Sequence, residues 1–132
     1  MDLSDFINQL SVLKNYKSLK EVLTDHKLAA LGDALINFTY SLALSKRRGQ
    51  PSGAKVRGAV LKEAVRKAGL REFMPSRVSS HMMADAAEAL IAYAWLKKHV
   101  TLEECVTILA EAENLVDGFT QLLSKIREKV TF

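Results

Sequence analysis

The stretch from residue 26 to residue 48 reads HKLAALGDALINFTYSLALSKRR and decides the fold. Its large apolar residues recur three and four positions apart, at Leu28, Leu31, Leu35, Phe38 and Leu42. This spacing places them on one face of an α-helix. We therefore expect a long helix that buries this face, and that ends in three cations complementing the negative end of the helix dipole.

The rest of the chain shows the same helical spacing. We expect further helices over residues 3–13, 19–23, 56–68, 80–99 and 102–130. Ser18 and Thr101 are each followed three residues later by Glu, a capping-box pattern that predicts two of the helix starts. No stretch of useful length alternates with a period of two. The predicted fold class is therefore all-α.

Length and composition favour one domain over residues 1–132 with its own core, because 48% of the 132 residues are hydrophobic. The single cysteine, Cys105, cannot form an internal disulfide, and we expect it to be a small core residue. No charged-then-apolar leader opens the chain, and no apolar run reaches about 18 residues. We therefore expect a cytoplasmic protein without a membrane segment.

The positive charge is concentrated in one part of the chain. Residues 34–62 contain no Asp or Glu but six cations, while the whole chain carries a net charge of +4. We call five of these cations the basic stripe: Lys46, Arg47, Arg48, Lys55 and Arg57. Such a stripe suits a polyanionic partner. A solvated loop with cations at a helix C-terminus explains the same pattern.

Two acidic positions interrupt the apolar pattern of the predicted helices. Asp33 lies inside the 26–48 helix beside Gly32, although both residue types are unfavourable in a helix interior. A carboxylate is therefore needed there, with a neighbouring helix pressed close against the glycine.

Asp85 and Glu88 form the second interruption, and their spacing places both on one helix face with no Lys or Arg within a turn. A divalent cation would relieve their repulsion, and hard oxygen ligands select Mg²⁺, Ca²⁺ or Mn²⁺ over Zn²⁺. A lysine from elsewhere in the fold, or exposure of both acids to solvent, would also relieve it.

The segments around these acids resemble a known family. HKLAALGDAL at residues 26–35 resembles the first signature of the ribonuclease III family, and ADAAEALI at residues 84–91 resembles its second. The resemblance covers about residues 19–98 and implies the helical bundle of the ribonuclease III endonuclease domain. By this resemblance Asp33, Asp85 and Glu88 match the catalytic, metal-binding acids, and Glu63 matches a further metal-binding acid.

One departure qualifies the resemblance. The family places a carboxylate one turn before the Leu-Gly-Asp aspartate, and this chain has Ala29 there. The short form called Mini-ribonuclease III also lacks that acid and has no appended double-stranded-RNA-binding domain, so the chain is most similar to that form. Ala30 stands where many members have an aromatic residue that contacts the partner subunit.

The resemblance implies Mg²⁺-dependent, or Mn²⁺-dependent, hydrolysis of double-stranded RNA by a homodimer, with the basic stripe on phosphates. One alternative is a non-catalytic, RNA-binding or structural member of the family, which Ala29 permits. Another is an unrelated helical bundle with surface acids. His26, His81 and His99 share no metal-ligand spacing, although His81 lies one turn before Asp85 and could line the site.

Overall fold

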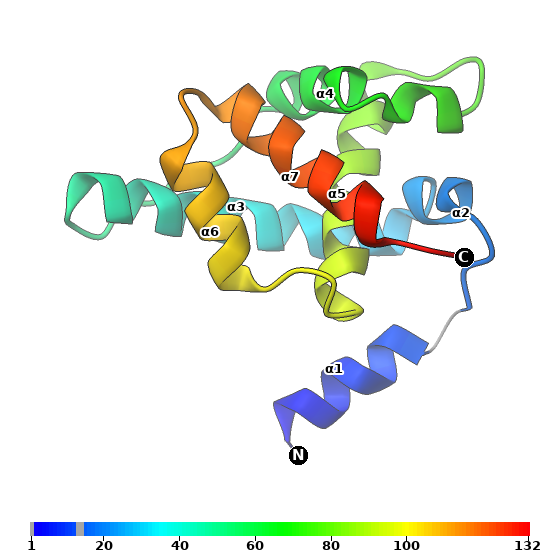
Figure 1. Cartoon of the computed structure of the whole chain (residues 1–132), viewed down its shortest axis with the longest axis horizontal. Helices are drawn as coiled ribbons and strands as arrows, with labels where there is room; N and C mark the ends of the chain where they lie inside the picture. The colour runs from blue at the N-terminus through cyan, green and yellow to red at the C-terminus, as the bar shows by residue number, and fades with distance from the viewer. Residues whose placement is uncertain (1, 13–14) are drawn as a thin grey trace.

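The computed structural model describes residues 2–12 and 15–132, and it confirms the all-α prediction (Figure 1). No strand occurs in those residues. The α-helices are α1 (Leu3–Val12), α2 (Leu19–Leu23), α3 (His26–Arg48), α4 (Gly58–Lys67), α5 (Ser80–Leu96), α6 (Leu102–Glu111) and α7 (Leu115–Lys129). The first predicted helix was expected to reach Leu13, which lies outside the described residues.

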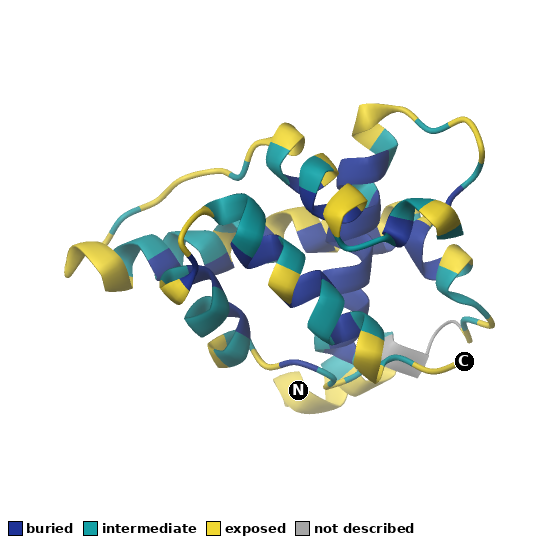
Figure 2. Cartoon of the chain, turned by 45° about the horizontal axis from the view of Figure 1, so that its top comes forward, coloured by how far each residue is buried: buried dark blue, intermediate teal, exposed yellow. Residues whose placement is uncertain are grey.

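Helix α5 is the centre of the fold, and α2, α3, α4 and α7 pack around it. Twelve of its residues are buried, and half of these are alanines. Buried residues of the other helices face it, while exposed residues lie on the periphery (Figure 2). Small side chains allow neighbouring helices to approach closely, and this surface determines how α3 crosses α5.

Helix α3 buries a different face from the one that its large residues predict. Leu28 is buried, but Leu31 is 39% exposed and Phe38 is 55% exposed. The buried face carries mostly small residues: Leu28, Ala29, Gly32, Ile36, Thr39 and Ala43. The prediction of the buried stripe was therefore wrong for Leu31 and Phe38, because close packing on the alanine-rich surface of α5 favours small residues over large ones. It is confirmed for Leu28, and Leu35 is partly buried against the core.

The long last helix that we predicted over residues 102–130 is two helices. α6 ends at Glu111 and α7 begins at Leu115, with Asn114 accepting the backbone N–H of Asp117 at 2.9 Å as an N-cap. Gly118 lies against α6, where an added Cβ would be 3.1 Å from the Leu109 Cδ2. The two helices pack against each other because this glycine lets α7 approach α6.

A short 3-10 helix, Leu70–Phe73, joins α4 to the segment before α5. The sequence pattern did not predict it, although the predicted end of α4 near Gly69 is confirmed by the positive φ of 74° at that glycine.

By length and hydropathy alone, α3 is long and apolar enough to cross a membrane, so the expectation of a protein without a membrane segment stays a prediction. The core helix of a water-soluble protein meets the same criterion, so this property by itself is weak evidence for a membrane.

Candidate active site

The site is formed where α3 crosses α5, and Gly32 sets the crossing. A Cβ added at Gly32 would lie 1.9 Å from the carbonyl oxygen of Glu88 and 2.9 Å from its Cα. No side chain fits in that space, so only glycine permits the contact. The expectation that a neighbouring helix presses against Gly32 is therefore confirmed, and the contact brings the next residue, Asp33, to Glu88.

A cavity at this crossing collects the three predicted catalytic acids. It is lined by His26, Ala29, Ala30, Asp33, His81, Asp85 and Glu88. Asp33 comes from α3, and Asp85 and Glu88 come from successive turns of α5. The convergence argues against the reading of these residues as unrelated surface acids on opposite faces of a bundle.

Glu88 is the most buried of the three acids, with an exposed fraction of 7%. Burial raises the pKa of its carboxyl group to about 8, with further contributions from a hydrogen bond with Asp33 and from the charges of Asp33 and Asp85. An ionised carboxylate in this position therefore lacks a compensating positive charge. A bound cation would supply that charge.

The donor set fits a hard divalent cation, because it consists of three carboxyl groups, one of them buried. Within the described part of the chain, no group of three or more His, Cys, Asp or Glu is already arranged to hold a metal ion. Asp33 is exposed, and its Oδ1 accepts a hydrogen bond from the Asn37 Nδ2 at 3.4 Å, in addition to the hydrogen bond that its carboxyl group makes with Glu88. Its side chain can therefore adjust to a ligand.

Two histidines flank Asp85. The sequence predicted this position for His81 but not for His26. The His81 Nε2 lies 3.4 Å from the Asp85 Oδ2, and the His26 Nδ1 lies 3.9 Å from the same oxygen. The spacing of His81 and Asp85, four positions apart on one helix, carried the signal for that pair. His26 belongs to α3, so its contact with Asp85 depends on how α3 crosses α5, and no spacing within one helix predicts it.

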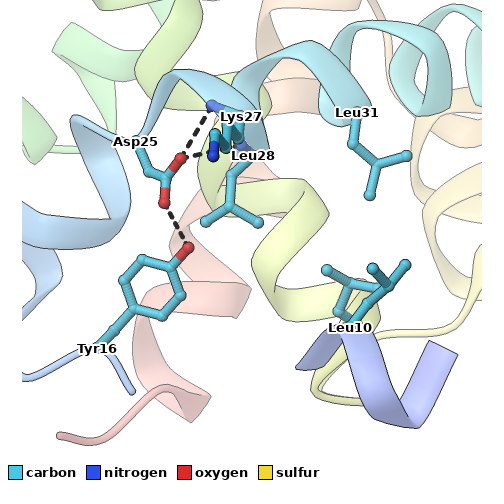
Figure 3. A pocket seen from close by; sticks show the side chains of 7 residues that line it. Leu10, Tyr16, Asp25, Lys27, Leu28 and Leu31 are labelled. Atoms are coloured by element: carbon cyan, nitrogen blue, oxygen red, sulfur yellow. Dashed lines mark hydrogen bonds between the residues drawn. The ribbon is translucent and has the colours of Figure 1, made fainter. Parts of the chain in front are cut away.

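A cap holds the start of α3, and with it His26. The carboxylate of Asp25 accepts the backbone N–H groups of Lys27 and Leu28 at 2.9 and 3.2 Å. Its other oxygen accepts the hydroxyl of Tyr16 at 2.5 Å, so Tyr16 orients the capping carboxylate (Figure 3). These bonds fix the first turn of α3 beside a second cavity, which Leu10, Leu28 and Leu31 help to line.

Ala29 and Ala30 occupy the wall of the acidic cavity one turn before Asp33. Ala29 is 5% exposed and supplies no ligand oxygen. The departure from the family pattern therefore falls inside the site itself.

The structure does not bring Glu63 to the other acids. Glu63 lies on α4, outside the residues that line the cavity, and its Oε2 accepts the Arg66 Nε at 3.1 Å. The bonds from Arg66 hold the pKa of this carboxyl group below its ordinary value. We therefore leave Glu63 out of the proposed metal ligands.

The basic stripe lies at the other end of α3 and in the following loop, and all five of its cations are exposed. None of the five pairs with an acid among the residues that the structure describes. They are therefore available to a polyanion.

Polar side chains spaced four residues apart on α3 fasten this loop to the helix. The Asn37 Oδ1 accepts the Val56 N–H at 2.8 Å, the Ser41 Oγ accepts the Ala54 N–H at 3.1 Å, and the Ser45 Oγ accepts the Ser52 N–H at 2.9 Å. We call Asn37, Ser41 and Ser45 the polar ridge. Sequence reasoning missed it, although the spacing on one face was visible in the sequence.

The fold and the site together define a class: an all-α domain that gathers carboxyl groups between two crossing helices and carries exposed cations along one of them. Residues 26–131 match the family model described as Ribonuclease III, so the chain belongs to the ribonuclease III family. The matched region begins at the first residue of α3 and contains all three acids and the basic stripe. No curated protein matches the chain significantly in sequence.

Proposed function

We propose that the protein is a divalent-metal-dependent endoribonuclease that hydrolyses phosphodiester bonds in double-stranded RNA. One observation carries the proposal: the crossing of α3 and α5 places Asp33, Asp85 and Glu88 around one cavity. Membership of the ribonuclease III family supports an activity on RNA. The free, buried thiol of Cys105 is compatible with a reducing, cytoplasmic setting.

Asp33, Asp85 and Glu88 would hold Mg²⁺, or Mn²⁺ in its place. When bound, the ion lowers the pKa of a coordinated water and stabilises charge on the phosphate. Glu88 would give up its proton on binding the ion, because positive charge offsets the burial and the repulsion that keep it protonated. Asp33, on the exposed side of the cavity, would complete the ligand set.

The basic stripe would hold the duplex through its phosphates, which positions RNA without reading sequence. Its cations are exposed, and the polar ridge fixes the loop that carries Lys55 and Arg57. This division leaves binding to the cations and chemistry to the acids.

A homodimer would place two such sites on the two strands of one duplex. The outer face of α3 supports this assembly, because Leu31 and Phe38 are large apolar residues that the monomer leaves exposed. We expect Phe38→Glu to weaken self-association by about tenfold or more, or about 1.4 kcal/mol, with little effect on unfolding. Ultracentrifugation at micromolar concentration measures this, and a strictly monomeric wild type contradicts the assembly.

The deciding experiment separates binding from cleavage. Glu88→Gln keeps the shape of the side chain and removes its charge, so it should bind duplex RNA and cleave it more slowly, by about 100-fold or more. Glu63→Gln is the matched control, because Glu63 lies outside the cavity, and it should cleave at the wild-type rate. Labelled duplex RNA with and without Mg²⁺ provides the assay.

Cleavage by Glu88→Gln at the wild-type rate would overturn the catalytic assignment. Ala29 favours a second reading, in which this member binds RNA without cutting it. Wild-type protein that binds duplex RNA but cleaves it with neither Mg²⁺ nor Mn²⁺ would establish that reading.

A further inference from the structure

Two imidazole rings converge on one carboxylate oxygen at the edge of the acidic cavity. The His81 Nε2 and the His26 Nδ1 both face the Asp85 Oδ2, at 3.4 and 3.9 Å. The histidine side chains are 84% and 81% exposed, whereas that of Asp85 is 20% exposed. The three residues thus form a half-open cluster in which two solvent-exposed rings approach one oxygen of a mostly buried carboxylate.

We propose that His26, His81 and Asp85 form a binding site for a transition-metal dication such as Co²⁺, Ni²⁺ or Zn²⁺. Imidazole nitrogen suits these borderline ions and is a poor ligand for Mg²⁺, which prefers oxygen. Two nitrogens and one carboxylate leave further coordination positions open to water. The site is distinct in chemistry from the three carboxyl groups, although Asp85 belongs to both.

The distance between His81 and Asp85 fits this interpretation, whereas the three residues together are not yet arranged around an ion. Two ligand atoms bound at about 2.1 Å lie about 3.0–3.4 Å apart in octahedral or tetrahedral geometry. The pair formed by His81 and Asp85 already has that separation, and a small rotation of the exposed His26 ring would bring it into range.

The backbone positions of the three residues are fixed independently of any ion. Asp25 caps the first turn of α3, which begins at His26. His81 and Asp85 lie four residues apart on α5, so their side chains project from one face. The contact of Gly32 with Glu88 then fixes the two helices relative to each other.

A simpler explanation is that the two exposed histidines pair weakly with Asp85 at the surface. Such pairing predicts no selective uptake of transition metals, so metal binding distinguishes the two. The inference shares Asp85 with the proposed nuclease site, but its test measures binding and not cleavage. Protein that binds Co²⁺ through these residues and never cuts RNA would support this site while overturning the proposed function.

The experiment uses the metal-stripped full chain without a histidine tag. Co²⁺ is titrated by visible absorption, and Mg²⁺ by calorimetry. We expect His26→Ala and His81→Ala each to weaken Co²⁺ binding by about tenfold or more, with Mg²⁺ binding within about twofold of wild type. His99→Ala is the matched control and should bind both ions as wild type does.

A second measurement needs no variant. Adding diamagnetic Zn²⁺ should shift the ring proton resonances of His26 and His81 and leave those of His99 in place. The proposal is overturned if the His26→Ala/His81→Ala double variant binds Co²⁺ like wild type, or if Zn²⁺ leaves all three ring signals unchanged. Equal loss of Co²⁺ binding in His99→Ala would also overturn it.

Discussion

The two ends of α3 are built in opposite ways. Near its start, the carboxyl groups are held by a backbone contact between Gly32 and Glu88 that leaves no space for a side chain. Past its end, the cations are exposed on a loop that hydrogen bonds fasten to the polar ridge. Positioning acids for chemistry demands a fixed geometry, whereas attracting a polyanion demands charge alone. Substitutions at the first end should therefore have large effects, and those at the second should have small ones.

Gly32→Ala should have the largest effect, because its Cβ would overlap the backbone of Glu88. We expect the free energy of unfolding to fall by about 4 kcal/mol or more. Denaturant titration measures the change. Gly53→Ala in the loop is the control, since nothing lies within 4 Å of an added Cβ there. Equal stability of Gly32→Ala and Gly53→Ala would show that the crossing is looser than the structure describes.

Glu88 should make the metal-free protein lose stability as pH rises. Its pKa is about 8 in the fold and near 4.5 when unfolded, so the folded state binds the extra proton between these values. This contribution to stability is complete below about pH 4.5 and is lost as pH rises towards 8. We expect the loss to be about 4 kcal/mol between pH 4.5 and pH 8.

Thermal melts at several pH values with a chelator present measure this loss. Glu88→Gln cannot ionise, so its stability should not show this fall, and at pH 8 it should exceed wild type. A wild-type profile parallel to that of Glu88→Gln would contradict the raised pKa.

Arg48→Ala should have the smallest effect, since it removes one of five exposed cations. Affinity for all RNA duplexes should fall by a similar factor of a few, and the slope of log affinity against log salt should flatten by roughly one unit. Fluorescence anisotropy at several salt concentrations tests this. Lys20→Ala, an exposed cation on α2 outside the stripe, should leave the slope unchanged. Unchanged binding in Arg48→Ala would indicate that the stripe is only a solvated loop.

The sequence predicted the parts of the site that break a local pattern. Gly32 and Asp33 are out of place in a helix interior, and Asp85 and Glu88 repel on one face, so each pair was visible without the fold. The sequence did not predict the buried face of α3, because apolar residues occur on two faces of this helix. The alanine-rich surface of α5 packs against the face that carries the smaller side chains. The contact of His26 with Asp85 was not predicted for a related reason, since the two residues lie on different helices.

The break between α6 and α7 shows a different limit. The apolar stripe is interrupted at Glu113 and resumes at Val116, so periodicity alone joined the two helices. Asn114 followed three residues later by Asp117 carried a capping signal that the stripe concealed.

Helix α3 and the polar ridge together fix the distance between the acids and the basic loop. Asp33 and Ser45 are twelve positions apart on one helix, a length of about 18 Å at 1.5 Å per residue. The loop cannot shift along the axis of α3, because its backbone is hydrogen-bonded to Asn37, Ser41 and Ser45 on three successive turns. One residue inserted between Asp33 and Asn37 would increase the distance from Asp33 to the loop, along the helix axis, by about 1.5 Å. It would also rotate Asp33 about that axis by about 100° relative to the loop. The separation of acids and cations is thus encoded as a number of helical residues, and loop length has little influence on it.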